Sequence, residues 1–147
     1  MLLDEKSKKL LLIERASNDL RKGLPVIIDS KDGKITVCSP ETIIPQIVSS
    51  IANKSNKLVI TNNRYNFINK DANLFENISI NIKNIDDMAA ICGLKYVEEI
   101  PDFDYCTANE AENTAIKLAK IAELIPSVIV TDYEKSYDED GIVTISQ

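Results

Sequence analysis

The sequence contains no histidine and no tryptophan, and the first absence is the most informative feature of its composition. Without an imidazole, the chain has no Ser-His-Asp or Cys-His nucleophilic pair, no histidine general base and no histidine-containing metal site. Aromatic residues make up only 5% of the chain, so isoleucine, leucine and valine must fill the core.

Long apolar runs and an excess of positive charge are also missing. No stretch approaches the ~18 consecutive apolar residues of a membrane span, and the apolar run at residues 10–13 is too short for a signal peptide. The formal net charge is −6, which argues against general nucleic-acid binding because phosphates require a basic face. We therefore expect a cytoplasmic protein that binds neither nucleic acid nor membrane.

The three cysteines, Cys38, Cys92 and Cys106, are isolated from one another. No pair has the spacing of a metal knuckle, and an odd count suits a reducing cytosol better than a disulfide framework. We interpret Cys38 and Cys92 as small buried hydrophobes. A chain of 147 residues predicts a single domain over residues 1–147, which buries roughly 68–70% of its unfolded surface without disulfides or metal.

The first third of the chain has clear helix and strand signals. Residues 4–22 predict a helix with a break near Ser17, an inner stripe that begins at Leu10, and Gly23 as its left-handed end. Strands at 25–29 and 34–38 flank an Asp-Gly turn, which is typical of a hairpin. Ser39 as cap and Pro40 in the first helical position predict the next helix.

The rest of the chain predicts shorter elements, apart from one long helix after residue 107. We predict strands at 57–61, 77–83 and 142–145, a strand near Tyr96, short helices at 63–71 and 86–92, and an acidic loop at 133–141. Thr107 and Glu110 have the spacing of a capping box, which predicts that the long helix begins there. A helix with an apolar stripe follows, Pro126 ends it, and residues 127–131 form a buried strand.

Helices that alternate with single strands and one hairpin predict an α+β fold. We expect a mixed, twisted sheet covered by helices on both faces, in three α/β/α layers.

Two stretches resemble the 3,4-dihydroxy-2-butanone 4-phosphate synthase family of riboflavin biosynthesis. They are residues 14–41, which include LRKGLPVIID, and residues 114–130, TAIKLAKIAELIPSVIV. More narrowly, the chain is similar to the N-terminal domain of certain bacterial GTP cyclohydrolase II proteins, which has often lost its active-site residues. The resemblance implies a homodimer and a cyclohydrolase domain as a partner. We expect this chain to be a shortened form in which the cyclohydrolase domain is absent.

The chain departs from the synthase pattern at two metal-binding positions. The family's acidic loop after the first strand supplies a magnesium-binding glutamate, whereas residues 29–34 here contain none. Ala111 stands where the family has a metal-binding histidine. The resemblance therefore implies no metal site and no cofactor, with magnesium expected only if synthase activity persists. Asp29, Asp32 and Asp132 are the remaining catalytic candidates, although Asp32 also suits an ordinary Asp-Gly turn.

Three functions remain open at this point. The first is a catalytically silent synthase-like domain, a pseudoenzyme that acts through folding, dimerisation or docking. The second is a working sugar-phosphate enzyme that acts on ribulose 5-phosphate through the three aspartates. The third is a non-catalytic phosphate-binding module that uses Arg15, Arg21, Lys22 and Thr114. For the N-terminal cations, a solvated helix face is the favoured interpretation.

Overall fold

The computed structural model describes residues 2–147 and contains one seven-stranded sheet, with strand order β5-β4-β3-β6-β2-β1-β7. The strands are β1 (Val26–Ser30), β2 (Gly33–Cys38), β3 (Asn56–Ile60), β4 (Ile78–Ile82), β5 (Tyr105–Thr107), β6 (Ser127–Asp132) and β7 (Thr144–Ser146). Every neighbouring pair is antiparallel except β1 with β7, which is parallel. The predicted mixed sheet is therefore confirmed.

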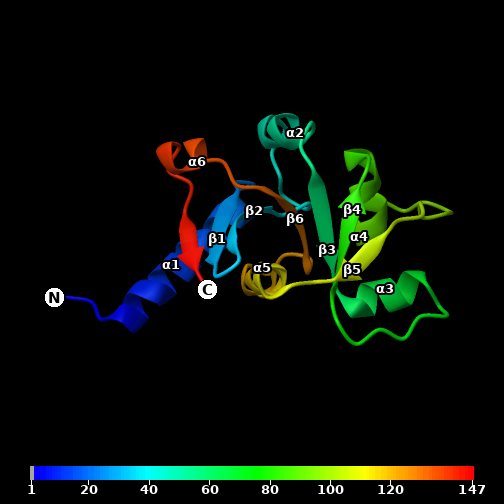
Figure 1. Ribbon diagram of the computed structural model, residues 1–147, viewed down its shortest axis with the longest axis horizontal. Coiled ribbons are helices and arrows are strands. Elements are labelled where there is room, and N and C mark those ends of the chain that lie inside the picture. The colour runs from blue at the N-terminus through cyan, green and yellow to red at the C-terminus, as the bar shows by residue number, and fades with distance from the viewer. Residues whose placement is uncertain (1) are drawn as a thin grey trace.

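Helices cover both faces of this sheet, as predicted. They are α1 (Glu5–Arg21), α2 (Pro45–Ile51), α3 (Asn62–Ile68), α4 (Met88–Cys92) with the preceding 3-10 turn η1 (Ile85–Asp87), α5 (Glu110–Ile121) and α6 (Ser136–Glu139). Figure 1 shows α1 and α5 on one side of the sheet and α2 and α6 on the other. Over residues 2–147, no helix has the length and apolarity to cross a membrane.

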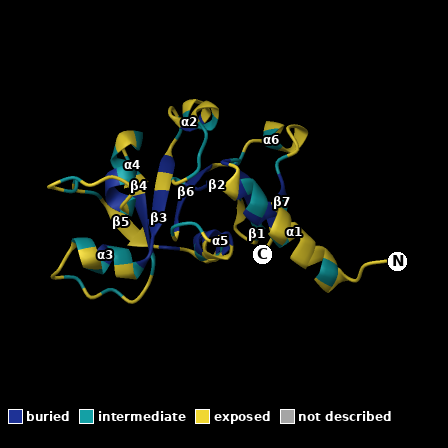
Figure 2. Ribbon diagram, turned by 180° about the vertical axis from the view of Figure 1, so that it is seen from behind, coloured by how far each residue is buried: buried dark blue, intermediate teal, exposed yellow. Residues whose placement is uncertain are grey.

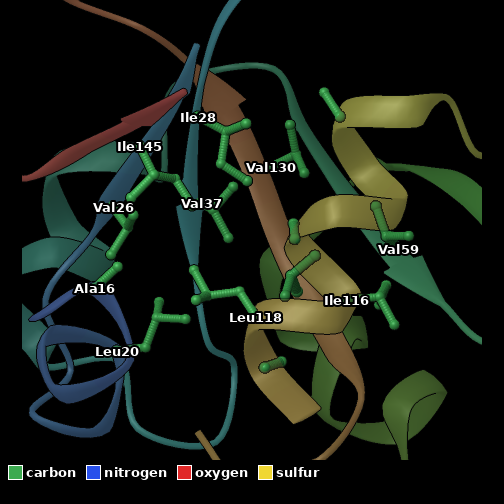
Figure 3. Packing of buried hydrophobic residues seen from close by; sticks show 14 of the residues in the cluster. Ala16, Leu20, Val26, Ile28, Val37, Val59, Ile116, Leu118, Val130 and Ile145 are labelled. Atoms are coloured by element: carbon green, nitrogen blue, oxygen red, sulfur yellow. The ribbon is translucent and has the colours of Figure 1, made fainter. Parts of the chain in front are cut away.

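The larger apolar cluster lies between the sheet and helices α1 and α5. Figure 3 shows sheet residues such as Val37 and Val130 pointing toward Leu20 of α1 and Leu118 of α5. Small residues line the same face of α5, and Ala115 is fully buried. Because alanine adds little bulk, α5 packs close to the strands. A second cluster fills the opposite face under α2 and α4.

Helix α5 begins at a different cap from the predicted one. Asn109 is its N-cap, and its side chain forms a capping box with Glu112. The predicted pair, Thr107 and Glu110, is wrong because Thr107 ends β5 and pairs with Ile78 of β4. Two overlapping sequences, T-x-x-E and N-x-x-E, offered the same local motif. Strand pairing selects the second.

The end of α5 also comes earlier than Pro126 predicts. The helix ends at Ile121, and Glu123 adopts a left-handed φ of 60°. The Leu124 amide then donates to the Ala119 carbonyl at 3.0 Å, as in a helix-ending turn. The chain thus leaves the helix before it reaches the proline.

The helix predicted from Ser39 and Pro40 is only a turn. The Ser39 side chain accepts from the next-but-one amide, but α2 itself begins at Pro45. Ile44, which precedes that proline, is extended with ψ 151°. Proline disfavours the helical conformation in the residue before it, so Pro45 separates the early turn from α2.

Helix α1 is continuous, without the break predicted near Ser17, and the Asp4 side chain caps it. Its inner stripe is shorter than expected because Leu10 is 58% exposed, whereas Ala16 and Leu20 are fully buried. Figure 2 shows that the first turns of α1 extend beyond the sheet, which explains this exposure.

The predicted strand near Tyr96 is absent, since residues 93–104 contain neither helix nor strand. The edge strand is instead β5, where the Tyr105 ring packs 4.9 Å from the Tyr65 ring, measured between centroids. Gly23 and Gly93 end α1 and α4 with φ of 85° and 93°, as predicted. The loop predicted at 133–141 contains the short helix α6.

Candidate functional site

The candidate site lies where the β1–β2 hairpin, the end of β6 and the start of α5 meet. Strand β2 lies between the other two strands, so that Lys34 pairs with Asp29 and Ile35 pairs with Asp132. An exposed ion pair of 3.8 Å joins Lys31 in the hairpin turn to the first residue of α5, Glu110. The fold therefore brings the predicted acidic segments to one edge of the sheet.

A cavity of about 160 Å³ opens at this edge, on the face that α5 covers. Its lining on that face includes Ile35, Lys57, Asn81, Asn109, Glu112 and Asp132. Ligand pockets for small molecules usually measure ~300 Å³ or more, so this cavity holds only a small group. Lys34 also lines the cavity. The ammonium groups of Lys34 and Lys57 and the start of α5 favour negative charge, whereas the carboxylates of Glu112 and Asp132 oppose it.

Glu112 is the most buried charged group at the site, with 3% of its surface exposed. One carboxylate oxygen accepts from the Asn109 backbone amide at 2.9 Å, and the other accepts from Ser79 Oγ at 2.7 Å. The Asn109 side chain accepts from the Glu112 amide at 2.8 Å. Glu112 therefore fixes the start of α5 to β4. The sequence carried a signal for this role in the N-x-x-E spacing of Asn109 and Glu112, which the prediction from Thr107 and Glu110 missed.

The three predicted aspartates do not gather their carboxylates in one place. Ile28 belongs to the core under α5, so the next residue, Asp29, points to the other face of the sheet. Asp132 pairs with Ile35, which packs against that same core, so Asp132 points to the α5 face. Asp32 lies in the exposed hairpin turn, where its amide donates to a serine hydroxyl.

The position expected to hold a metal ligand carries no donor. Ala111 is buried in the core under α5, and its methyl group cannot coordinate an ion. Within the described part of the chain, residues 2–147, no group of three or more histidine, cysteine, aspartate or glutamate side chains is arranged to hold a metal. Glu112 and Asp132 are the carboxylates that line the cavity at this edge, and both oxygens of Glu112 already accept hydrogen bonds within the protein.

The cations predicted to bind phosphate point to separate places. Arg15 donates to the Gly141 carbonyl at 3.1 Å, and Arg21 donates to the Ala122 carbonyl at 3.1 Å. Each guanidinium thus stabilises the end of another element. Lys22 is exposed. The structure does not bring these three side chains together around one anion.

Thr114, the fourth phosphate candidate, lies on α5 about one turn after its start. Its hydroxyl donates to the Glu110 carbonyl at 3.1 Å. This bond is a common one for threonine within helices. Thr114 thus has an ordinary structural role.

The cysteines differ in burial. Cys38 is buried, and burial raises the pKa of its thiol to about 12. Cys92 is half-buried, and burial likewise raises its pKa. Cys106 is exposed on the edge strand β5. The interpretation of Cys38 as a small buried hydrophobe is confirmed.

No protein-family model and no curated protein matches this chain. Among solved structures, it is similar to a two-domain 3,4-dihydroxy-2-butanone 4-phosphate synthase from A. baumannii, with TM-score 0.65 and 14% identity over 91% of this chain and 55% of that one. It is also similar to the 3,4-dihydroxy-2-butanone 4-phosphate synthase of Candida albicans, with TM-score 0.60 and 13% identity over 91% and 92%. The chain has the synthase fold. It spans about half the length of the A. baumannii protein.

The predicted resemblance is thus confirmed for the synthase fold. Identities of 13% and 14% establish the fold alone. The homodimer, the cyclohydrolase partner and the loss of activity remain predictions.

Proposed function

We propose that this chain is a catalytically silent domain of the synthase fold, which serves riboflavin biosynthesis alongside a GTP cyclohydrolase II activity. It acts through folding, dimerisation or docking rather than through chemistry. The observation that carries the proposal is the division of the acidic candidates, with Asp29 and Asp132 on opposite faces of the sheet.

The remaining polar groups support the same proposal. Enolisation of a sugar phosphate requires a positioned base and charge stabilisation at the developing oxyanion. Both carboxylate oxygens of Glu112 already accept hydrogen bonds within the fold, and Ala111 offers no donor. Of the three aspartate candidates, only Asp132 lines the cavity. One exposed carboxylate is insufficient for this reaction class.

The competing hypothesis, a working enzyme on ribulose 5-phosphate, makes an opposite prediction. The test incubates the purified chain with ribulose 5-phosphate and magnesium and measures the butanone phosphate product, with an active synthase as the positive control. We expect no turnover. Turnover that disappears in the Asp132→Asn variant would refute the silent-domain proposal. Turnover that is unchanged in this variant identifies a contaminating enzyme or a site elsewhere, and an Asp29→Asn variant then distinguishes these two.

The association part of the proposal needs a separate experiment. Sedimentation of the chain alone tests for a homodimer, and sedimentation of a mixture with GTP cyclohydrolase II tests for docking. We expect a complex in at least one case. A monomer at every concentration that also fails to bind the cyclohydrolase would contradict the proposed mode of action.

A further inference from the structure

An open cavity of about 460 Å³ lies between α1 and α5, the two helices on one side of the sheet in Figure 1. The helices meet at their C-terminal ends, where Arg21 donates to the Ala122 carbonyl at 3.1 Å. Residues 5–13 of α1 supply one wall of the cavity, and residues 114–121 of α5 supply the other. Its volume falls within the ~300–1,000 Å³ of small-molecule pockets, whereas the cavity at the candidate site measures only about 160 Å³.

The interior of this cavity is apolar. Its deepest residues are Ile13, Leu118 and Ile145, which belong to the core under α1 and α5 or pack against it. Leu12 and Ile121 lie nearer the surface, with 40% and 56% of their area exposed. Both therefore face water in the empty cavity. A ligand with an apolar body gains free energy by covering them.

The charged residues of the lining are mostly lysines. Lys8, Lys9 and Lys117 line the cavity together with one acidic residue, Glu5, and all four are exposed. Glu5 offsets one positive charge through its ion pair with Lys8, at 3.8 Å. The lining thus has an excess of positive charge, although the whole chain has a formal net charge of −6. Charge complementarity favours an anionic ligand over a neutral or cationic one.

We propose that this cavity binds the anion of a long-chain carboxylic acid, with its tail against Leu118 and Ile121 and its carboxylate at the lysines. A dry cavity of ~150 Å³ holds the six carbons of benzene, so about 460 Å³ has room for a tail of about ten carbons. Two turns of a partner helix, about 10–12 Å in diameter, would occupy more than this volume. The site does not depend on the proposed function.

The test measures the binding of decanoate to the full chain by isothermal titration calorimetry. Decanol and decyltrimethylammonium carry the same tail with a neutral and a cationic head, and all three ligands are kept below the concentrations at which they aggregate. We expect one decanoate to bind per chain, about three- to tenfold more tightly than decanol, with the cation weakest. Added salt should reduce the difference between decanoate and decanol, because it screens the lysines.

Two pairs of matched variants locate the ligand. Lys117→Gln should weaken decanoate binding about three- to fivefold without changing decanol binding, whereas Lys120→Gln, on the same helix but outside the lining, should change neither. Ile121→Glu places a carboxylate in the cavity and should abolish decanoate binding. Leu11→Glu changes an apolar residue of similar exposure outside the lining and should preserve it. All four positions are exposed, so we expect every variant to fold.

Three results would overturn the proposal. They are the absence of saturable decanoate binding, equal affinities of the natural chain for decanoate and decanol, and decanoate binding by Ile121→Glu as tight as that by Leu11→Glu. A second copy of the chain is the competing occupant. A dimer in sedimentation that Ile121→Glu dissociates and decanoate does not would assign the cavity to a subunit contact instead.

Discussion

Replacing Glu112 with alanine tests whether this carboxylate is structural. The change leaves the Ser79 hydroxyl and the Asn109 amide without their acceptor, and it opens space beneath the first turn of α5. Each hydrogen bond to a charged group contributes about 1.5–3 kcal/mol, and loss of a capping interaction costs about 1 kcal/mol. Part of this loss in stability is avoided because the Asn109 side chain still caps the helix. We therefore expect the free energy of unfolding to fall by about 3 kcal/mol.

The assay is urea unfolding followed by circular dichroism, with Glu110→Ala as the matched control. Glu110 lies in the same first turn but is exposed, and its ion pair with Lys31 has a long, 3.8 Å separation. Such exposed pairs contribute at most about 1 kcal/mol. A Glu112→Ala variant that loses no more stability than the Glu110→Ala control would refute the structural assignment. It would also return Glu112 to the set of available catalytic groups.

Three further outcomes follow from the structure. Folding raises the pKa of the Cys38 thiol from 9.0 to about 12, so the thiol ionises first in the unfolded chain. Between these two pH values, the free energy of unfolding should fall by about 1.4 kcal/mol per pH unit. Urea unfolding at alkaline pH should show a shallower decline for Cys38→Ala. A thiol reagent should label exposed Cys106 in the folded chain but Cys38 only after unfolding, as mass spectrometry of peptides would reveal. Gly23→Ala should destabilise the protein by several kcal/mol, because a Cβ at this position would lie 2.7 Å from Ile44 Cγ2. Gly141→Ala has open space around the new Cβ and should cost only about 1–2 kcal/mol, because the residue keeps a positive φ. Thermal unfolding of the two variants tests this difference.

Local patterns predicted much of the fold. The Asp-Gly turn specified the hairpin because its conformational preference is local, and Gly23 ended α1 for the same reason. The apolar stripe of α5 identified its buried face, including Ala115 and Leu118. Prediction failed where two local signals competed. Strand pairing of Thr107 and the proline after Ile44 then decided the outcome.

The candidate site was harder to predict because it depends on strand register. The predicted strands placed Asp29 and Asp132 at strand ends. Only the pairing of β2 with β1 and β6 shows that the two side chains point to opposite faces of the sheet. The pairing of two buried threonines on neighbouring strands has the same origin. Threonines at 36 and 131 each fit an ordinary strand, and their adjacency arises from pairing between segments far apart in the sequence.

The position of β6 in the sheet has a consequence for biosynthesis. This strand is the sixth of seven along the chain, yet it lies between β3 and β2 and is the element that joins them. Until residues 127–132 leave the ribosome, the hairpin of β1 with β2 and the ribbon of β3 to β5 remain two fragments with exposed inner edges. Such edges pair readily with other chains. The emerging polypeptide is therefore most vulnerable to aggregation while β3 to β5 are outside the ribosome and β6 is not.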